Sequence, residues 1–413
     1  MPDVYDLIYD WNRADDEPPG PKKRIQLDDE TLRDGLQSPS VLNPPIEAKI
    51  RILHLMDALG IDTADVGQPA AGPREYEHTL RLAQETVTAG LRIAPNCAAR
   101  TVVSDIQPIV DIAERIGRPI EACVYIGSSP LRMDVEGWTL DFLLRRVEEA
   151  VTFAVRHGLP VMFVTEDTTR AHPDTLTKLY TTAIYCGAQA VCIADTVGHA
   201  TPRGAYRVTR FIRELCDRTA PGTRVDWHGH RDRGLDVANV LAAVEAGADR
   251  VHGAAIGIGE RAGNTPMELI LVNLKLLGYI DNDLSRLPEY CETVSRAVGV
   301  PIPHNYPVVG RDAFRTATGV HAAAVIKALR RGDVHLANMV YSGVPAHLFG
   351  LRQVIEVGPL SGKSNVVYWL ESHGYPVTDE LVERIFEYAK RSDHILTDAE
   401  IEQLIAATAS APA

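Results

Sequence analysis

Eight short runs of apolar and β-branched residues recur between residues 24 and 259, and a stretch with helical periodicity follows most of them. The runs span residues 24–29, 63–67, 91–97, 120–127, 160–167, 190–197, 224–230 and 250–259. Turn residues bound these runs, which is typical of buried strands. Eight such strand–helix units predict an α/β fold, a (β/α)8 TIM barrel. A doubly wound open sheet is the alternative, but it rarely contains so many regular units.

Two of the intervening stretches show the helical pattern clearly. Residues 140–158 carry apolar side chains at helical spacing, with Gly158 as a C-terminal stop, and residues 234–248 show the same pattern. A stripe of this kind predicts a helix that packs one face on the sheet.

The pattern changes after residue 280. Residues 288–310 are expected to form a proline-rich connection, and a helix is predicted over residues 310–332. Helices are also predicted over residues 378–393 and 397–410. In the last of these, Thr397 and Glu400 have the spacing of a capping box.

We therefore expect three parts. An N-terminal arm, residues 1–23, is polar and acidic, lacks the apolar core of a signal peptide, and is expected to be disordered or to lie on a neighbouring subunit. The catalytic barrel would span residues 24–280. A linker and a mainly helical C-terminal subdomain would span residues 281–413.

Charge and cysteine usage narrow the class of protein. The net charge is −13 (42 basic against 55 acidic residues), which disfavours general nucleic-acid binding but leaves room for a small polyanion held by local arginines. No segment reaches the roughly 18 consecutive apolar residues of a membrane span. Six cysteines, none in CxxC spacing, lie mostly inside apolar runs. They predict reduced core thiols and a cytoplasmic protein.

The ends of the predicted strands are unusually polar. They read "DDETLRD", "TEDTTR", "ADTVGHATP", "HGHRDR" and "GIGERAGN". In a barrel of this type the catalytic residues lie at the C-terminal ends of the strands. These segments are therefore expected to meet in one site.

The "HGH" segment is the first candidate for metal binding. Residues i and i+2 of a strand face the same side, so His228 and His230 can both point into the barrel mouth. Taken alone, an HxH segment is equally consistent with two unrelated polar residues at a loop. Asp34, at the end of the first strand, would complete an open-sided set for Mg, Mn or Zn, and Asn264 could add an amide oxygen.

Two other strand ends allow more than one interpretation. Glu166 is better placed for the mouth than Asp167, which can equally be a solvated acid paired with Arg170. Asp195 or Thr196 can cap the next helix, or the Thr196 hydroxyl can bind a carboxylate. The Gly-rich residues 257–264 lack the spacings of nucleotide-binding loops, and no GxSxG elbow is present.

Together these motifs resemble the DRE-TIM metallolyase superfamily. "DETLRDGLQ", "EDTTR", "ADTVGHATP", "HGHRDRGLDVANVLAAVEAGADRV" and "GIGERAGN" carry the likeness over residues 24–370. It is closest to the Claisen-condensing branch, the family of 2-isopropylmalate, homocitrate and citramalate synthases. The tail segments "VVGRDAFRTATGVHAAA" and "VYSGVPAHLFG" resemble the C-terminal subdomains of these synthases, which the hydroxymethylglutaryl-CoA lyases lack.

The resemblance implies metal ligands and catalytic residues. Asp34, His228 and His230 would bind the divalent metal, with Asn264 nearby or ligating. Arg33 would stabilise the developing oxyanion.

It also implies substrate contacts and a proton-handling set. Gln37 would contact substrate, and Thr196 would hold the carboxylate of a 2-oxo acid. Glu166, His321 and Tyr341 would handle protons, the last two reaching the active site of the partner subunit in a homodimer. Acetyl-CoA would be the co-substrate, because an enolate-stabilising cation, a base and a Lewis acid are the parts that this condensation requires.

The sequence departs from the family pattern at informative positions. Gln68 stands where the isopropylmalate synthases usually carry Phe, and Arg132 where they usually carry His. Homocitrate synthases have an arginine at the second position, so Arg132 favours a dicarboxylic 2-oxo acid; its alternative is a surface ion pair with Glu136. In the tail, Thr316 replaces a usual His, and residues 322–323 replace Gln-Asp.

Three functions remain open on the sequence alone. The first is a synthase that joins acetyl-CoA to a 2-oxo acid. A lyase of the same superfamily and a non-catalytic paralogue are the alternatives. The sequence stops after the helix over residues 397–410, so we expect no feedback control by leucine of the usual type.

Overall fold

A computed structural model describes residues 7–13 and 22–409. By its internal contacts the chain forms two compact units, one over residues 22–301 and one over residues 302–409 together with residues 7–13. Most of the predicted N-terminal arm lies outside the described residues. Its described part contains a short 3-10 helix, η2 (Trp11–Arg13), and the exposed side chains of Tyr9 and Trp11.

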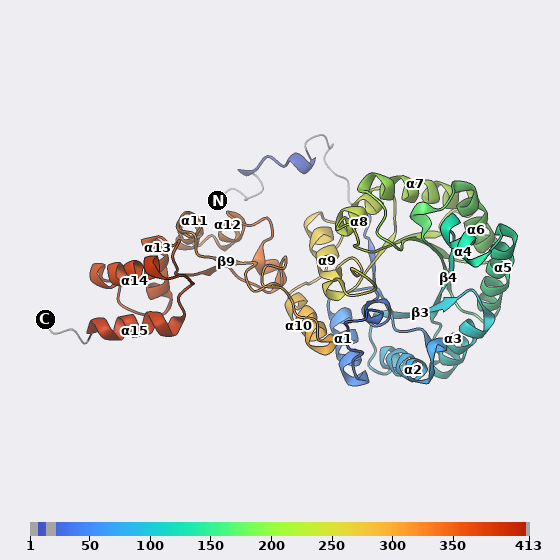
Figure 1. The fold of residues 1–413 in the computed structure, drawn as a ribbon, viewed down its shortest axis with the longest axis horizontal. Helices are drawn as coiled ribbons and strands as arrows, with labels where there is room; N and C mark the ends of the chain where they lie inside the picture. Colours follow the sequence, from blue (N-terminus) through green and yellow to red (C-terminus); the bar gives the residue numbers. More distant parts are fainter. Residues whose placement is uncertain (1–6, 14–21, 410–413) are drawn as a thin grey trace. The chain divides into compact units, whose positions relative to one another are not determined.

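The first unit is a closed barrel of eight parallel strands, as predicted (Figure 1). Each strand pairs with its neighbours in chain order, and β1 closes the ring against β8. The strands are β1 (Gln26–Asp29), β2 (Thr63–Asp65), β3 (Ala94–Arg100), β4 (Glu121–Gly127), β5 (Val161–Glu166), β6 (Ala190–Asp195), β7 (Arg224–Gly229) and β8 (Arg250–Gly253). All eight runs predicted from the sequence therefore form strands.

Two strand boundaries were predicted wrongly. Strand β3 begins at Ala94 and continues to Arg100, three residues later than expected at each end. Strand β8 ends at Gly253 instead of continuing to residue 259. There the chain turns through a 3-10 helix, η6 (Ala255–Gly257), because the Ala254 N–H donates to the Thr265 carbonyl and the Ala254 carbonyl accepts from Met267.

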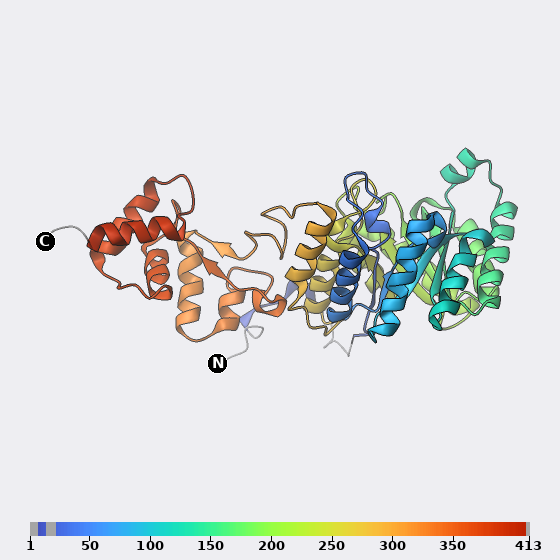
Figure 2. The ribbon, with the colours of Figure 1, turned by 90° about the horizontal axis from the view of Figure 1, so that it is seen from below.

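Helices surround the ring of strands (Figure 1). They are α1 (Ile46–Ala58), α2 (Pro73–Thr88), α3 (Val103–Ile116), α4 (Pro130–Glu136), α5 (Leu140–Arg156), α6 (Pro173–Tyr185), α7 (Pro202–Thr219), α8 (Asp236–Glu245) and α9 (Met267–Leu276). Helix α5 shows why they form: Thr139 caps its start, one apolar face is buried, and Gly158 with φ 76° follows its end. Helix α4 buries none of its residues and stands away from the wall of the barrel (Figure 2).

Residues 288–310 are not simply the connection that was expected. Helix α10 (Leu287–Val298) occupies the first half of this segment and packs Tyr290, Cys291 and Val294 into the core. Its proline lies at the first helical turn, where a missing N–H costs nothing. Proline content was therefore misleading at this position.

The second unit is mainly helical. It contains α11 (Gly319–Arg330), α12 (Val334–Met339), η7 (Ala346–Phe349), α13 (Lys363–Ser372), α14 (Asp379–Arg391) and α15 (Asp398–Ala409). The helix predicted over residues 310–332 begins only at Gly319, because the chain before it forms β9 (Arg315–Thr316), which pairs with β10 (Val354–Ile355). The capping box is confirmed: Thr397 N donates to Glu400 and Glu400 N donates to Thr397 Oγ1.

A layer of paired charges fills the interior of the barrel near the start of β7 and β8. Arg250 is 1% exposed and donates to Asp226 and to Glu121, both at 2.7 Å. Arg224 also donates to both carboxylates, at 2.9 Å to Asp226 and 2.5 Å to Glu121. Each of these four side chains faces opposite charges, which is how buried ions are tolerated. We refer to Glu121, Arg224, Asp226 and Arg250 as the ion layer.

The six cysteines are free, and all except Cys186 are buried. The predicted reduced core thiols are thus confirmed as free thiols. No helix among residues 7–13 and 22–409 is long and apolar enough to cross a membrane.

Candidate active site

A cavity of about 140 Å³ opens among the C-terminal ends of the strands. Seven of the residues predicted from the sequence line it: Arg33, Asp34, Gln37, Glu166, Thr196, His228 and His230. They come from four different strand ends, those of β1, β5, β6 and β7, and the closed parallel topology brings them together.

Three of these residues form a candidate metal centre. His228 lies on β7 and His230 just beyond it, so the alternation of the strand turns both rings inwards. Asp34 begins a 3-10 helix, η3 (Asp34–Leu36), that follows β1. One donor atom from each of the three residues lies within 4.8 Å of the others, and the His230 Nε2 to Asp34 Oδ2 distance is 3.7 Å.

Asn264 completes this set. A β-bridge joins it to His230, and its amide Nδ2 donates to Asp34 Oδ2 at 2.8 Å. Among the described residues, no hydrogen-bond partner reaches the buried Asn264 Oδ1 or His230 Nδ1. A buried carbonyl oxygen without a partner calls for an explanation, and a divalent cation between a carboxylate and two imidazoles provides one. The residues present therefore fit a metal ion.

The electrostatics of the centre suit metal binding. Burial, with the charge of His228, lowers the pKa of His230 to about 4, so this imidazole is neutral with a free lone pair at physiological pH. Burial alone would raise the pKa of Asp34, but the charges of Arg33 and His228 hold it below its usual value. The carboxylate is thus ionised, as a ligand must be.

Arg33 faces the cavity between two carboxylates. Its Nε donates to Asp65 Oδ2 at 2.6 Å, and its Nη1 donates to Asp34 Oδ1 at 2.7 Å. The side chain is 18% exposed, so part of the guanidinium remains open to the cavity. This arrangement fixes the positive charge of the Arg33 guanidinium beside the candidate metal centre.

Glu166 is the last residue of β5 and lines the cavity. Among the described residues, no cationic side chain lies within ion-pair distance of its carboxylate. Burial raises the pKa of its carboxyl group, and the more distant charges of Arg132 and Arg33 oppose this only in part. A raised pKa makes the carboxylate a stronger base. Its neighbour Asp167 instead forms an ion pair with Arg170 at 2.7 Å, one of the two interpretations open from the sequence.

Neither Asp195 nor Thr196 caps the next helix. Thr201 is the N-cap of α7, and its hydroxyl accepts from Gly204 N. Asp195 is buried and accepts from His199 N and from the Thr169 hydroxyl. The Thr196 hydroxyl accepts from Asp167 N at 2.8 Å and lies at the cavity wall, where it can still donate its proton to a ligand.

Five predicted residues do not line this cavity. One of them, Asn264, still contacts Asp34. Gln68 donates to the hydroxyl of Tyr125 at 3.2 Å. Arg132 lies on α4, where it pairs with Glu136 at 3.1 Å and is 51% exposed. The remaining two, His321 and Tyr341, belong to the second unit, where their rings stack with centroids 4.0 Å apart.

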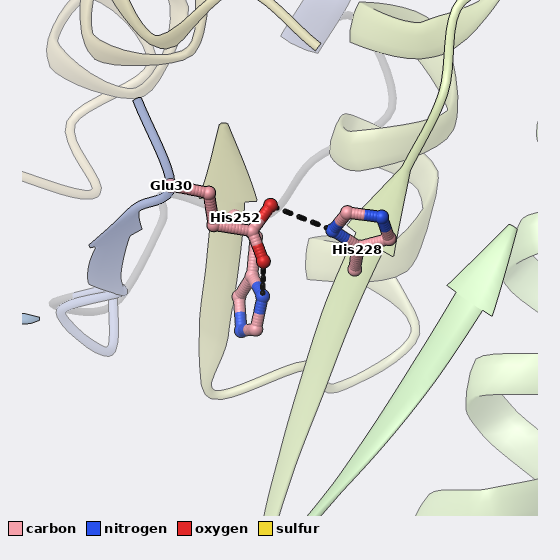
Figure 3. Close-up of side chains that lie close together, drawn as sticks. All are labelled: Glu30, His228 and His252. Atoms are coloured by element: carbon pink, nitrogen blue, oxygen red, sulfur yellow. Dashed lines mark hydrogen bonds and ion pairs between the residues drawn. The ribbon is translucent and has the colours of Figure 1, made fainter. Parts of the chain in front are cut away.

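Sequence reasoning missed a second set of polar residues beside the metal centre. Glu30 accepts from His228 Nδ1 at 2.7 Å and from His252 Nδ1 at 3.0 Å (Figure 3). His252 in turn lies 3.2 Å from Asp226, a member of the ion layer. Strand alternation on β8 could have revealed His252, because its position in "RVHG" faces the barrel interior. Glu30 follows β1 in an acidic run whose members the sequence alone does not distinguish.

Similar proteins are found over most of the length of this chain. The profile of the HMGL-like family matches residues 24–294. A probable 2-isopropylmalate synthase of Methanopyrus kandleri is 34% identical over 371 residues, which are 89% of this chain and 69% of that protein. The homocitrate synthase AksA of the same organism is also 34% identical, over 91% of this chain and 90% of its own length.

Solved structures resemble the barrel at lower identity. The hydroxymethylglutaryl-CoA lyase of Pseudomonas aeruginosa has a TM-score of 0.55 and 20% identity, and covers 67% of this chain and 93% of its own. The carboxyl transferase domain of Rhizobium etli pyruvate carboxylase has a TM-score of 0.53 and 19% identity, over 87% of this chain and 62% of that one. At 20% and 19% identity, the likeness to these solved structures shows the fold alone. The family match and the two relatives together show that the chain belongs to the HMGL-like (DRE-TIM) family.

Proposed function

We propose that this protein is an acyltransferase that condenses acetyl-CoA with a 2-oxo acid, giving a 2-hydroxy dicarboxylate or tricarboxylate and CoA. One observation carries the proposal: the donor set of Asp34, His228 and His230 shares a cavity with Arg33 and Glu166. The similar synthases support it, because their likeness extends over 89% and 91% of this chain and so continues past the barrel. A lyase would not require the second unit.

Asp34, His228, His230 and the orphaned oxygen of Asn264 would hold a divalent cation. When bound, such a cation acts as a Lewis acid that polarises the ketone of a 2-oxo acid. The Thr196 hydroxyl would donate to the substrate carboxylate, and Gln37 would contact the substrate from the η3 side of the cavity.

Proton transfer is the remaining requirement. The methyl group of acetyl-CoA is a weak acid, so its proton must go to a positioned base while a cation stabilises the enolate oxygen. Glu166 is the base in this proposal, and Arg33 faces the enolate oxygen. The enolate carbon then attacks the ketone carbon, the new alkoxide takes a proton, and water cleaves the thioester to release CoA.

His321 and Tyr341 would complete the proton-handling set from the partner subunit. Tyr341 is 51% exposed and stacks on His321, so the pair is presented at the surface of the second unit. We propose a homodimer in which this unit serves the partner's site. Mixing inactive Glu166→Ala chains with inactive His321→Ala chains should restore activity in heterodimers, whereas no recovery after confirmed subunit exchange would contradict the exchange.

The cavity favours a 2-oxo acid with a small, uncharged side chain. Its lining includes the short apolar side chains of Ala98 on β3, Cys123 on β4 and Cys192 on β6. Of the described residues that line it, Arg33 is the only arginine or lysine, and two carboxylates already occupy it. A distal carboxylate would therefore be buried without a free cation, which is costly. Arg132 lines a neighbouring pocket with Glu166 and Thr196, and it is the residue through which a dicarboxylic 2-oxo acid would bind.

We also propose a cytoplasmic location, supported by the free cysteine thiols, since oxidising compartments favour disulfides.

A substrate panel tests the function. The protein is incubated with acetyl-CoA, Mg²⁺ or Mn²⁺, and one of pyruvate, 2-oxoisovalerate, oxaloacetate or 2-oxoglutarate, and CoA release is followed with a thiol reagent. We expect thiol release that requires a 2-oxo acid and is abolished by a chelator. Cleavage of hydroxymethylglutaryl-CoA with no turnover of any 2-oxo acid would instead support the lyase. Inactivity in both assays would favour the non-catalytic paralogue.

A further inference from the structure

We propose that Glu30 is a positioning residue that fixes the metal ligand His228 and ties it to the other ligand, Asp34. The inference rests on the metal centre of the proposed function. No role for Glu30 follows from the motifs that identify the family, and its side chain does not belong to the donor set of Asp34, His228 and His230.

The side chain of Glu30 determines which nitrogen of His228 faces the cation. Its Oε2 accepts from His228 Nδ1 at 2.7 Å, and its Oε1 accepts from His252 Nδ1 at 3.0 Å (Figure 3). Because Nδ1 is engaged with Glu30, Nε2 is the nitrogen of His228 that would bind a cation. A ligating histidine usually donates its other N–H to a carboxylate in this way, which fixes the ring and its tautomer.

The backbone of Glu30 holds Asp34. Its carbonyl oxygen accepts from Arg33 N at 3.2 Å and from Gly35 N at 2.9 Å, so it closes the turn that carries Asp34. Its own N–H donates to the Gly253 carbonyl of β8 at 2.8 Å. One residue therefore connects the strand ends that supply two of the three ligands.

Glu30 cannot readily move away from this position. Its side chain is 5% exposed, and that of His252 is 1% exposed. His252 is held from its other side by Asp226, 3.2 Å from Nε2, and Asp226 is fixed by the arginines of the ion layer. A line of hydrogen bonds thus connects the ion layer to His228.

An alternative is that Glu30, His228 and His252 themselves bind a cation, since their donor atoms also lie within 4.8 Å of one another. Both oxygens of Glu30 already accept from the two imidazole N–H groups, which favours a hydrogen-bonded set. The two interpretations differ in the expected loss of metal affinity. A ligand is indispensable, whereas loss of an orienting carboxylate costs about 10- to 100-fold in affinity.

The test is a calorimetric titration of metal-stripped full-length protein with Mn²⁺, with no substrate present. Four proteins are compared: wild type, Asp34→Ala, Glu30→Gln and Glu121→Gln. Glu121→Gln is the matched control, because it makes the same change at another glutamate inside the barrel, 13% exposed, that contacts no candidate ligand.

We expect Asp34→Ala to bind no Mn²⁺, Glu30→Gln to bind about 10- to 100-fold more weakly than wild type, and Glu121→Gln to bind like wild type. The electron paramagnetic resonance spectrum of bound Mn²⁺ should also change in Glu30→Gln, because the His228 ring is no longer fixed. If Glu30→Gln does not fold, Glu30→Asp serves instead: it keeps the charge but shortens the reach, and the same weakening is expected.

Three results would overturn the inference. Wild-type affinity in folded Glu30 variants would show that the carboxylate positions nothing. Complete loss of binding in Glu30→Gln, as in Asp34→Ala, would make Glu30 a ligand. If the wild-type protein itself binds no Mn²⁺, the proposed metal centre is wrong, and the inference about Glu30 fails with it. In the first result, by contrast, the wild-type protein binds Mn²⁺ and only the role of Glu30 is contradicted.

Discussion

The two ends of strand β7 place charged side chains in the same barrel interior and use them differently. At its start, Arg224 and Asp226 contact each other at 2.9 Å and take part in the ion layer. At its end, His228 and His230 approach Asp34, but the His230 Nε2 to Asp34 Oδ2 distance is 3.7 Å. The buried His230 Nδ1 has no hydrogen-bond partner in the described part of the chain. The charged groups of the first set are all paired with one another, whereas the second set keeps atoms that are free to bind a metal.

This difference separates stability from function within one strand. Paired buried ions contribute to a unique structure, and removal of one partner leaves an uncompensated charge. Incompletely satisfied polar groups cost stability and persist in native proteins mainly where they serve binding or catalysis. We therefore expect substitutions near the end of β7 to change activity far more than stability, and substitutions near its start to do the reverse.

Asp34→Ala should have the largest effect on activity. Loss of a metal ligand removes the stabilisation of transition-state charge, so kcat/KM should fall by about 1000-fold or more. The free energy of unfolding should change by only about 1 kcal/mol, the order of the hydrogen bonds that are lost. Steady-state kinetics and urea unfolding measure the two quantities. A large loss of stability would break the comparison.

Glu166→Gln should lower kcat by about 100- to 10,000-fold, the usual contribution of a general base. Wild-type activity should also show an acidic limb. The base acts when deprotonated, and burial raises its pKa above 4.5, so kcat/KM should decline as the pH falls through a value above 4.5. A profile of kcat/KM against pH tests this. If kcat/KM declines only at or below pH 4.5, or if kcat is unchanged in the variant, Glu166 is not the general base.

Arg250→Met tests the other end of the comparison. Asp226 and Glu121 would each lose a buried partner, so the free energy of unfolding should fall by about 3–5 kcal/mol. The kcat of the variant molecules that remain folded should fall by less than about 100-fold, the loss expected when a catalytic group is removed. Urea unfolding and activity at low temperature provide the measurements. The reverse pattern, a stable but inactive protein, would mean that the ion layer belongs functionally to the site.

Arg132→Met should have the smallest effect. Its exposed pair with Glu136 contributes about 0–1 kcal/mol to stability, so urea unfolding should barely change. The order of kcat/KM among 2-oxo acids should stay the same, with a small neutral acid first. A specific loss of 2-oxoglutarate turnover would show that Arg132 binds the distal carboxylate, as its sequence position suggested.

The fold was predictable because strand periodicity and turn residues are local signals. All eight strands were expected, and the polar strand ends led to Arg33, Asp34, Glu166 and the two histidines of β7. The extent of β8 could not be predicted, because its end is determined by hydrogen bonds to Thr265 and Met267, which depend on tertiary structure. Glu30 was missed for a related reason: its importance comes from two histidines about 200 residues away.

The cysteine distribution makes this protein convenient to label. Burial raises the pKa of the thiols of Cys97, Cys123 and Cys192 well above the usual value, so a maleimide dye or thiol reagent has little access to them as reactive thiolates. Cys186, at the end of α6, is the one cysteine that is not fully buried. Donor- and acceptor-labelled populations can therefore be prepared without mutagenesis. Energy transfer after mixing them would time the exchange of subunits on which the heterodimer experiment depends.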